Sequence, residues 1–338
     1  MAITDAARES PVEFKELPDR ADDEWDRLVC ASSQGTVYHN ACWLRAVSRL
    51  TGDTVVLWGA RHEGRLVAGV PLRVRRKGPF SDARRGFATP YNGAVLQPGL
   101  ERPLREGLPR ALRELAQRFS HCAIAASPFA APLEADTGWR ARSRATYLLR
   151  GGTADAVWTG MTSQVRNHIR VAEKAGVTVA VEPGGADFYR IYREVFEGQG
   201  LFVPFSQEAF VAFLATVRTE GLGEVYAART RDGALCAASL VLRDERRGYH
   251  SLSASHRELK KTGAASLLVW EIIRELYRTL DAFDFGGANV PQIARFKSGF
   301  RGQLLEYPEY IHSRSLWEKA LIGCARRVRS LTGTGAYD

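Results

Sequence analysis

A helix followed by a β-hairpin occurs twice in this sequence, and this repeat constrains the fold more than any other feature. In the first copy, residues 38–50 carry apolar side chains at helical spacing, and residues 54–60 and 66–74 are apolar runs typical of strands. Glu63 and Gly64 lie between the two runs. This pair favours a tight hairpin turn, because glycine readily adopts the positive φ that such a turn requires.

The second copy has the same elements in the same order. Residues 205–217 have the helical pattern, residues 224–228 and 234–242 have the strand pattern, and Asp232 and Gly233 lie at the turn. Any α/β chain contains some helix–hairpin units, but two copies in register with the same type of turn favour a duplication. We therefore expect two similar domains in tandem.

The length of the chain supports this division. Its 338 residues, 45% of them hydrophobic, are enough for two cores of ordinary size. We expect residues 1–150 to form the first domain and residues 151–315 the second, joined around residues 148–161. No apolar run approaches the roughly 20 residues of a membrane span, and the N-terminus is too polar for a signal peptide. The sequence predicts a cytoplasmic protein without a membrane span, and we expect a monomer.

Cysteine and histidine usage argues against a metal centre. The five cysteines are scattered and none forms a Cys-x-x-Cys pair, and the seven histidines have no metal-binding spacing. We expect neither a metal nor a cofactor. The net charge of +9 is compatible with a polyanionic partner such as a nucleic acid, although Arg-rich sequences often carry such a charge without one.

The order of elements in the second half resembles that of a GCN5-related N-acetyltransferase (GNAT) domain. This resemblance implies an α/β fold in which a mixed, mostly antiparallel sheet is flanked by helices. The expected elements are a basic helix at 163–176, a strand at 177–181, a helix at 187–197, the hairpin, a strand at 249–253, a helix from 264 to about 280 and a strand at 282–285.

Two lysines precede the helix that begins near residue 264. Lys260 and Lys261, followed by Gly263 and Ala264, place ammonium groups and backbone N–H groups at one helix N-terminus. This combination suits a phosphate group. A capped helix with solvated lysines explains the same residues equally simply.

A second group of residues suits acyl transfer. Gly286 and Gly287 allow the strand before them to break and a ligand to approach the backbone closely. Lys297, flanked by Phe296 and Phe300, is expected to lie against apolar surface, where its ammonium would stabilise a developing oxyanion better than in water. The alternative is a surface lysine whose stem covers two aromatic rings.

These motifs together resemble the FemABX peptidyltransferase family. The segments Phe-Asp-Phe-Gly-Gly at 283–287 and Phe-Lys-Ser-Gly-Phe-Arg-Gly at 296–302, with the basic segment 166–176 upstream, carry the resemblance. It extends over about residues 30–312 and is strongest from 160 to 312. The family consists of twin GNAT-like domains that transfer an amino acid from aminoacyl-tRNA to an amine, in cell-wall or antibiotic biosynthesis.

The resemblance implies further properties of this chain. The long coiled-coil arm of larger members is missing after Tyr192, and residues 316–338 are expected to pack back on the first domain. Where members that bind nucleotide-linked wall precursors carry basic residues, this chain has Val47 and Gly198, which favours a smaller or differently charged amine as acceptor.

The resemblance also assigns candidate roles. Lys297 and Phe296 are implied at the reaction centre. Asp284, Glu197 and His250 are candidates for removing the proton from the amine. Tyr249, His250 and Ser251 are candidates for lining the acceptor pocket. Tyr91 and Asn92 are candidates for the lip of the first domain, although a plain turn explains them equally well.

Donor identity is left open by the sequence. Arg166, Arg170 and Lys174 recur every fourth residue on one helical face, and arginines also cluster between residues 73 and 85, which together suit tRNA. An acyl-CoA-dependent N-acyltransferase of the same fold, with coenzyme A as donor, is the main alternative. A catalytically inactive tRNA-binding protein is the second.

Overall fold

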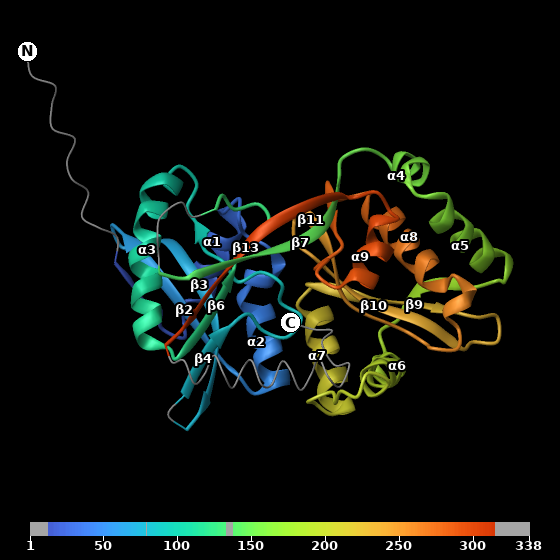
Figure 1. Cartoon of the computed structure of the whole chain (residues 1–338), viewed down its shortest axis with the longest axis horizontal. Helices are drawn as coiled ribbons and strands as arrows, with labels where there is room; N and C mark the ends of the chain where they lie inside the picture. The colour runs from blue at the N-terminus through green and yellow to red at the C-terminus, as the bar shows by residue number, and fades with distance from the viewer. Residues whose placement is uncertain (1–12, 79, 133–137, 315–338) are drawn as a thin grey trace, which may run out of the picture.

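The computed structural model describes residues 13–78, 80–132 and 138–314, and the strands form one large mixed sheet (Figure 1). Helices cover both faces of this sheet. In chain order, the strands of the described residues are β1 (Phe14–Glu16), β2 (Thr54–His62), β3 (Arg65–Lys77), β4 (Phe80–Arg84), β5 (Val95–Leu96), β6 (His121–Ala125), β7 (Arg140–Arg150), β8 (Thr178–Val181), β9 (Gly223–Arg229), β10 (Leu235–Arg243), β11 (Arg247–Ser255), β12 (Ala282–Asp284) and β13 (Gln303–Ser313).

Several helices begin at residues that suit a helix N-terminus. The Thr162 and Ser206 hydroxyls accept hydrogen bonds from the backbone N–H groups of Val165 and Ala209, three residues further along. The described helices are α1 (Asp22–Ala31), the 3₁₀ turn η1 (Val37–His39), α2 (Ala41–Thr51), α3 (Glu101–Arg118), α4 (Ala154–Gly160), α5 (Ser163–Lys174), α6 (Ala186–Glu197), α7 (Gln207–Thr219), the 3₁₀ turn η2 (Lys260–Thr262), α8 (Ala264–Leu276) and α9 (Pro291–Ser298).

The strand order confirms the predicted duplication. Across the sheet it runs β1-β2-β3-β4-β6-β13-β7-β12-β11-β10-β9-β8, with β5 beside β3. The set β2-β3-β4-β6 on one side of the central pair mirrors the set β9-β10-β11-β12 on the other, and in each set the last two strands are parallel. Helix α2 precedes the hairpin β2–β3 as α7 precedes β9–β10. The predicted α/β fold of two similar halves is therefore confirmed.

The two central strands are exchanged between the halves. β7 ends the first half of the chain but pairs with β12, and β13 ends the second half but pairs with β6 (Figure 1). The two strands also pair with each other from Gln303↔Leu148 to Ile311↔Arg140. The expected joint at 148–161 is therefore not a plain linker, because it contains the end of β7 and all of α4. The segment 316–338, expected to pack on the first domain, lies outside the described residues.

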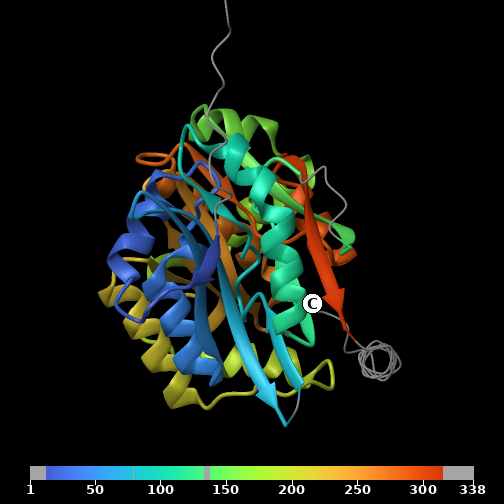
Figure 2. The same ribbon diagram turned by 90° about the vertical axis from the view of Figure 1, so that its left-hand side faces the viewer.

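Apolar side chains are buried on both faces of the sheet. In the first half, α3 covers one face over β2, β3 and β6 (Figure 2). In the second half, α5 and α8 cover a corresponding face. A third cluster lies between the halves, where α2 meets α7. Among its buried tyrosines are Tyr38 and Tyr91 from the first half and Tyr249 and Tyr307 from the second, so the cluster joins the two halves.

Candidate active site

β11 and β12 separate at the middle of the second half. They pair in parallel over only three residues, the last pair being Tyr249↔Asp284, and β11 then continues to Ser255 paired with β10 but no longer with β12. Beyond this point β11 also has a bulge, because His250 pairs with Val241 and Leu252 pairs with Leu240, which leaves Ser251 without a partner on β10. Bulges occur frequently beside active sites, where they reorient backbone and side chains.

Lys297 is buried next to this split. Its side chain is on the last turn of α9, and its Nζ donates hydrogen bonds to the carbonyl oxygens of Gly286 (2.5 Å) and Gly287 (2.8 Å). Only 8% of the residue is exposed. Burial lowers the pKa of Lys297 to about 8, and the negative charge of Asp284 opposes this shift. The site therefore holds an ammonium group in one orientation at neutral pH.

The loop that contains Gly286 and Gly287, called the glycine loop below, approaches β11 very closely. Gly286 has a φ of +64°, and a Cβ added there would lie 2.8 Å from the carbonyl oxygen of His250. A larger residue would push the loop away from the strand, so this glycine fixes the carbonyls that hold Lys297.

Asp284 is fully buried at the end of β12 and receives three hydrogen bonds. Oδ1 accepts from the Thr146 hydroxyl (2.6 Å) and the Gly286 N–H (2.8 Å), and Oδ2 accepts from the Tyr91 hydroxyl (2.7 Å). Burial raises the pKa of Asp284, whereas these donors and the charge of Lys297 lower it. Since Thr146 is on β7 and Tyr91 is in the loop after β4, the first half of the chain completes the surroundings of this carboxylate.

The two phenylalanines that flank Lys297 in the sequence pack on aromatic rings. Phe296 packs on Phe300 with ring centroids 5.5 Å apart, and Phe300 packs on Phe285 at 5.4 Å. Consecutive helical residues point about 100° apart, so Phe296 and Phe300 share one face of the chain while Lys297 points to the glycine loop. Lys297 is buried, as expected, and backbone carbonyls hold its ammonium, whereas contact of its stem with these two rings stays a prediction.

His250 and Tyr249 both use their polar atoms within the fold. His250 Nε2 lies 2.9 Å from the Ser239 hydroxyl, and burial, with the charge of Lys297, lowers the pKa of His250 to about 3. With this pKa the imidazole of His250 is uncharged at neutral pH and is a weak base. The Tyr249 hydroxyl donates to Asp244 (2.5 Å), at the hairpin before β11.

Asn92 and Glu197 are placed by other contacts. The Asn92 amide donates to the Ala123 carbonyl (3.3 Å) and accepts from the Ala125 N–H (2.9 Å), so it fastens the loop to β6. Glu197 ends α6, pairs with Arg193 on the same helix (3.3 Å) and is about half exposed. Neither contact brings these residues to Lys297, and their roles in binding substrate stay predictions.

The N-terminus of α8 is held against α5. Gly263 has a φ of +76°, and a Cβ there would lie 2.1 Å from the His168 carbonyl oxygen. The N–H of Ala264 is 3.3 Å from the Thr262 hydroxyl, and Lys261 is exposed. The backbone of Lys260 is in η2. The helix itself ends at Leu276, one turn before the predicted end near 280, and residues 277–279 form a turn.

The basic residues of α5 do not form one free stripe. Arg166 points back to the C-terminus of α4, where it donates to the carbonyl oxygens of Thr159 (3.1 Å) and Met161. The Arg170 guanidinium lies 5.7 Å from the centroid of the Trp158 ring, and Lys174 is exposed. The outer part of this face, from Arg170 to Lys174, is the part exposed to a polyanion.

Two hydroxyl groups lie near the split, that of Ser251, a candidate for the acceptor pocket, and that of Tyr38, which was not anticipated from the sequence. Tyr38 Oη and Ser251 Oγ are both buried and close enough for Ser251 to affect the pKa of Tyr38. Within the described part of the chain, neither atom makes a hydrogen bond of good geometry. Buried polar groups are normally satisfied, so such a pair marks a place where a ligand or water binds. The bulge that sets Ser251 apart was not predicted, because it depends on pairing with β10.

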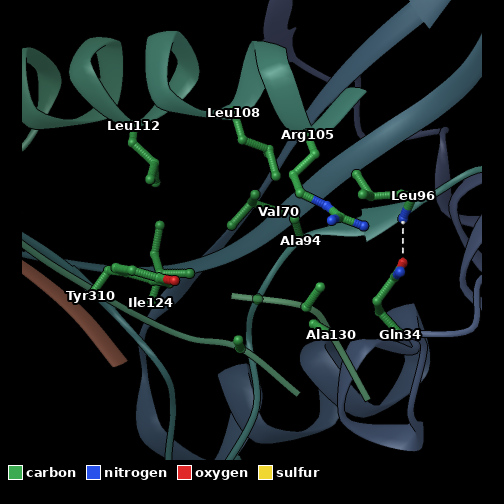
Figure 3. Close-up of a pocket in the computed structure, with 13 residues that line it drawn as sticks. Gln34, Val70, Ala94, Leu96, Arg105, Leu108, Leu112, Ile124, Ala130 and Tyr310 are labelled. Carbon is green, nitrogen blue, oxygen red and sulfur yellow. Dashed lines mark hydrogen bonds between the residues drawn. The ribbon is translucent and has the colours of Figure 1, made fainter. Parts of the chain in front are cut away.

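A concave pocket in the first half lies away from these residues. It lies between α3 and the sheet, and Arg105 from α3 points toward its interior (Figure 3). Lys297, Asp284 and the glycine loop do not line it. Within residues 13–78, 80–132 and 138–314, no three side chains of the metal-binding types come together, and no helix is both long and apolar enough to cross a membrane.

Comparison with known proteins identifies this architecture. Residues 160–298, from the end of α4 to the end of α9, match the family described as Acetyltransferase (GNAT) domain. No curated protein sequence matches the chain. The crystal structure of FemX is similar, with a TM-score of 0.66 at 13% sequence identity over 88% of this chain and 96% of FemX. The chain has a FemX-like fold.

Two other solved structures share the FemX-like arrangement. A tandem GNAT protein from the clavulanic acid biosynthesis pathway has a TM-score of 0.53 at 15% identity, covering 90% of this chain and 99% of that chain. The C-terminal domain of a putative lysylphosphatidylglycerol synthetase from Agrobacterium fabrum has a TM-score of 0.57 at 15% identity, covering 93% and 97%. The predicted fold of two GNAT-like halves is thus confirmed, and the GNAT match over the split and Lys297 supports an acyltransferase.

Proposed function

We propose that this protein is an aminoacyltransferase that moves an aminoacyl group from aminoacyl-tRNA to an amine and forms an amide. The observation that carries the proposal is the buried Lys297 ammonium, fixed by Gly286 and Gly287 beside the split of β11 and β12 in a GNAT half. The similarity in fold to FemX and to a lysylphosphatidylglycerol synthetase domain supports the aminoacyl group over a plain acetyl group.

The proposed reaction does not require a covalent intermediate between the protein and the aminoacyl group. The aminoacyl ester is already activated, so a neutral amine attacks its carbonyl carbon directly. A C–N bond forms, the C–O bond to the tRNA ribose breaks, and the leaving oxygen takes up the proton that the amine loses. Holding the two reactants about 3 to 3.5 Å apart in the right orientation lowers the barrier by several kcal/mol.

Lys297 supplies the electrostatic part of this reaction. Backbone carbonyls accept from two of its three N–H groups, and within the described part of the chain the third is left for the oxyanion of the tetrahedral intermediate. Because the ammonium is fixed before the substrate arrives, little reorganisation is required as charge develops. Asp284 positions the glycine loop through the Gly286 N–H and opposes the loss of charge on Lys297.

The unpaired hydroxyls of Tyr38 and Ser251 suit the acceptor amine or the α-amino group of the donor. They come from different halves and meet near the end of β12. The bulge at Ser251 also leaves a residue of β11 outside the ladder with β10, where a carbonyl substrate has access to backbone groups.

The rival function is acyl-CoA-dependent N-acylation, which the N-terminus of α8 supports. The exposed Lys261 and the first turn of α8 suit the phosphates of coenzyme A as well as those of tRNA. The second alternative is a tRNA-binding protein without catalytic activity. In that case the basic residues would bind tRNA, but Lys297 would act on no substrate.

The donor is tested in an extract that charges tRNA with labelled amino acids, supplemented with the protein and a panel of primary amines. We expect labelled amide that disappears after RNase treatment and falls steeply with added salt, because phosphate contacts are salt-dependent. Amide formation that resists RNase and requires an acyl-CoA would support the rival. Retention of tRNA with no amide from any amine would support the inactive protein.

A pH profile tests the charge on Lys297. With its pKa at about 8, the ammonium is lost as the pH rises, so kcat/KM calculated per neutral amine should fall about tenfold per pH unit well above pH 8. Lys297→Arg keeps its charge throughout, since a guanidinium titrates above pH 12. We expect this variant to be slower but to lack the alkaline fall. The same fall in both proteins would assign it to another group.

A further inference from the structure

A cluster of three arginines surrounds one buried glutamate on the sheet between the halves. The Nε atoms of Arg85, Arg142 and Arg144 lie 2.9, 2.8 and 3.1 Å from the Glu309 carboxylate. Glu309 is only 1% exposed and Arg144 only 4%. We call these four residues the arginine cluster. It holds three positive charges against one negative charge.

The arginine cluster and the carboxylate of Asp284 lie on the same face of the sheet. Arg144 is opposite Tyr307 and Arg142 is opposite Glu309 in the β7–β13 ladder, and paired residues point to the same side. Thr146, which donates to Asp284, is two residues from Arg144 on the same strand. At about 3.3 Å per residue, the arginines lie roughly 7 to 14 Å along the strand from Thr146.

Tyrosine rings connect the two groups. Tyr307 packs edge to face on Tyr91 with centroids 5.0 Å apart, and Tyr91 donates to Asp284. Tyr307 experiences the charges of Arg85, Arg144, Glu309 and Asp284. The loop after β4 supplies both Arg85 and Tyr91, so one segment of the first half reaches both groups.

The excess charge of the cluster is open to solvent on one side. The side chains of Arg85 and Arg142 are 21% and 32% exposed, while Glu309 is enclosed. Each of these two arginines presents five N–H groups, and Glu309 accepts from Arg85 through Nε and from Arg142 through Nε and Nη2. Like charges held together at low exposure repel one another, and a second anion would relieve that repulsion. A planar guanidinium pair suits a carboxylate or phosphate group.

The position of the cluster favours the acceptor over the donor. Phe283 and Phe285, on either side of Asp284, pack into the core under α5 and α8, whereas Asp284 faces the tyrosines. The N-terminus of α8, suited to the donor phosphate, therefore belongs to the opposite face from the arginine cluster. A donor on one face and an acceptor on the other would meet at the end of β12.

We propose that the arginine cluster binds an anionic group, a carboxylate or phosphate, of the acceptor, so that the acceptor is an amine that also carries such a group. The assignment of the anion to the acceptor rests on the proposed aminoacyl transfer. The binding of an anion by the arginine cluster does not depend on it. The residues concerned are Arg85, Arg142 and Arg144, with Glu309 as their internal counter-charge.

The test measures binding of pyrophosphate and of succinate by titration calorimetry in low salt, without any turnover. We expect saturable binding of at least one probe, and the better probe distinguishes phosphate from carboxylate. Arg142→Gln and Arg85→Gln should each weaken binding at least tenfold. Arg113→Gln, which removes an exposed arginine of α3, is the matched control and should bind as the unchanged protein does. Circular dichroism checks that each variant is folded.

Glu309→Gln gives a result of opposite sign. Removing the internal carboxylate leaves three positive charges without their competitor, so this variant should bind the probe several-fold more tightly. A cluster with only a structural role would show weak binding that is equal in all variants, and that result would overturn the proposal. Unchanged binding of both probes in Arg142→Gln, with weaker binding of deacylated tRNA, would also overturn it and assign the cluster to the donor. If the unchanged protein forms no amide from any donor and amine but still binds the probes, the proposed function is refuted and this anion site stands.

Discussion

Lys297→Met should reduce the rate of amide formation by at least 10²–10³-fold while leaving the protein folded. Removing one preorganised donor to an oxyanion commonly has an effect of this size. Methionine fills nearly the same buried volume, so the loss reports the missing charge and hydrogen bonds more than a cavity. The comparison is made with initial rates at saturating donor and acceptor, because a donor that acts mainly in the transition state lowers kcat.

A second methionine substitution provides the control. Lys15, on β1, has a side chain that is 70% exposed, so Lys15→Met makes the same chemical change away from the site and should have the rate of the unchanged protein. If Lys297→Met is folded, as judged by its thermal transition, and retains more than a tenth of the rate, then Lys297 does not stabilise the oxyanion. The glycine loop would then be a structural clamp around a buried lysine.

Gly263→Ala should destabilise the protein by about 2–5 kcal/mol. A left-handed backbone costs a non-glycine residue roughly 1–2 kcal/mol, and forcing a methyl group into a packed contact costs about 1–3 kcal/mol more. The added Cβ would lie 2.1 Å from the His168 carbonyl oxygen, so either the start of α8 or α5 must move. Urea unfolding measures the change, and the KM for the donor should rise because the first turn of α8 shifts.

Gly221→Ala separates the two contributions. Gly221 has a similar φ of +67° but no atom within 4 Å of an added Cβ. This control should lose only the backbone part, about 1–2 kcal/mol, and should leave the donor KM unchanged. Equal losses of stability in the two variants would mean that the contact between Gly263 and α5 is loose enough to absorb a methyl group.

Local patterns in the sequence predicted the repeated units because their signals are local. Helical spacing at 38–50 and 205–217, and the glycine turns after them, lie within short segments, and the structure has helices and hairpins there. The central strands were missed because their pairing is not local. β7 and β13 are about 160 residues apart in the chain, and β13 contains Pro308, which weakens the signal for an inner strand.

Site residues that belong to a local motif were predictable from the sequence. Site residues that are placed by the pairing of distant strands were not. Lys297 and Gly286 were found from their spacing, and the structure brings them together. Thr146 had no signal, because its role depends on β7 lying next to β12. The arginine cluster left a partial trace, since Arg140, Arg142 and Arg144 alternate along one strand and must share a face. Their counter-charge at Glu309 follows only from the pairing of β13.

The exchange of β7 and β13 joins segments that are synthesised far apart in time. Tyr91 is synthesised first, in the loop after β4, and Thr146 follows on β7. Asp284, whose carboxylate accepts hydrogen bonds from both, is synthesised much later. A nascent chain that has already emerged as far as Lys297 therefore still lacks β13, and its sheet is open down the middle. The strand that closes the sheet beside β7 is thus the last one in the described chain.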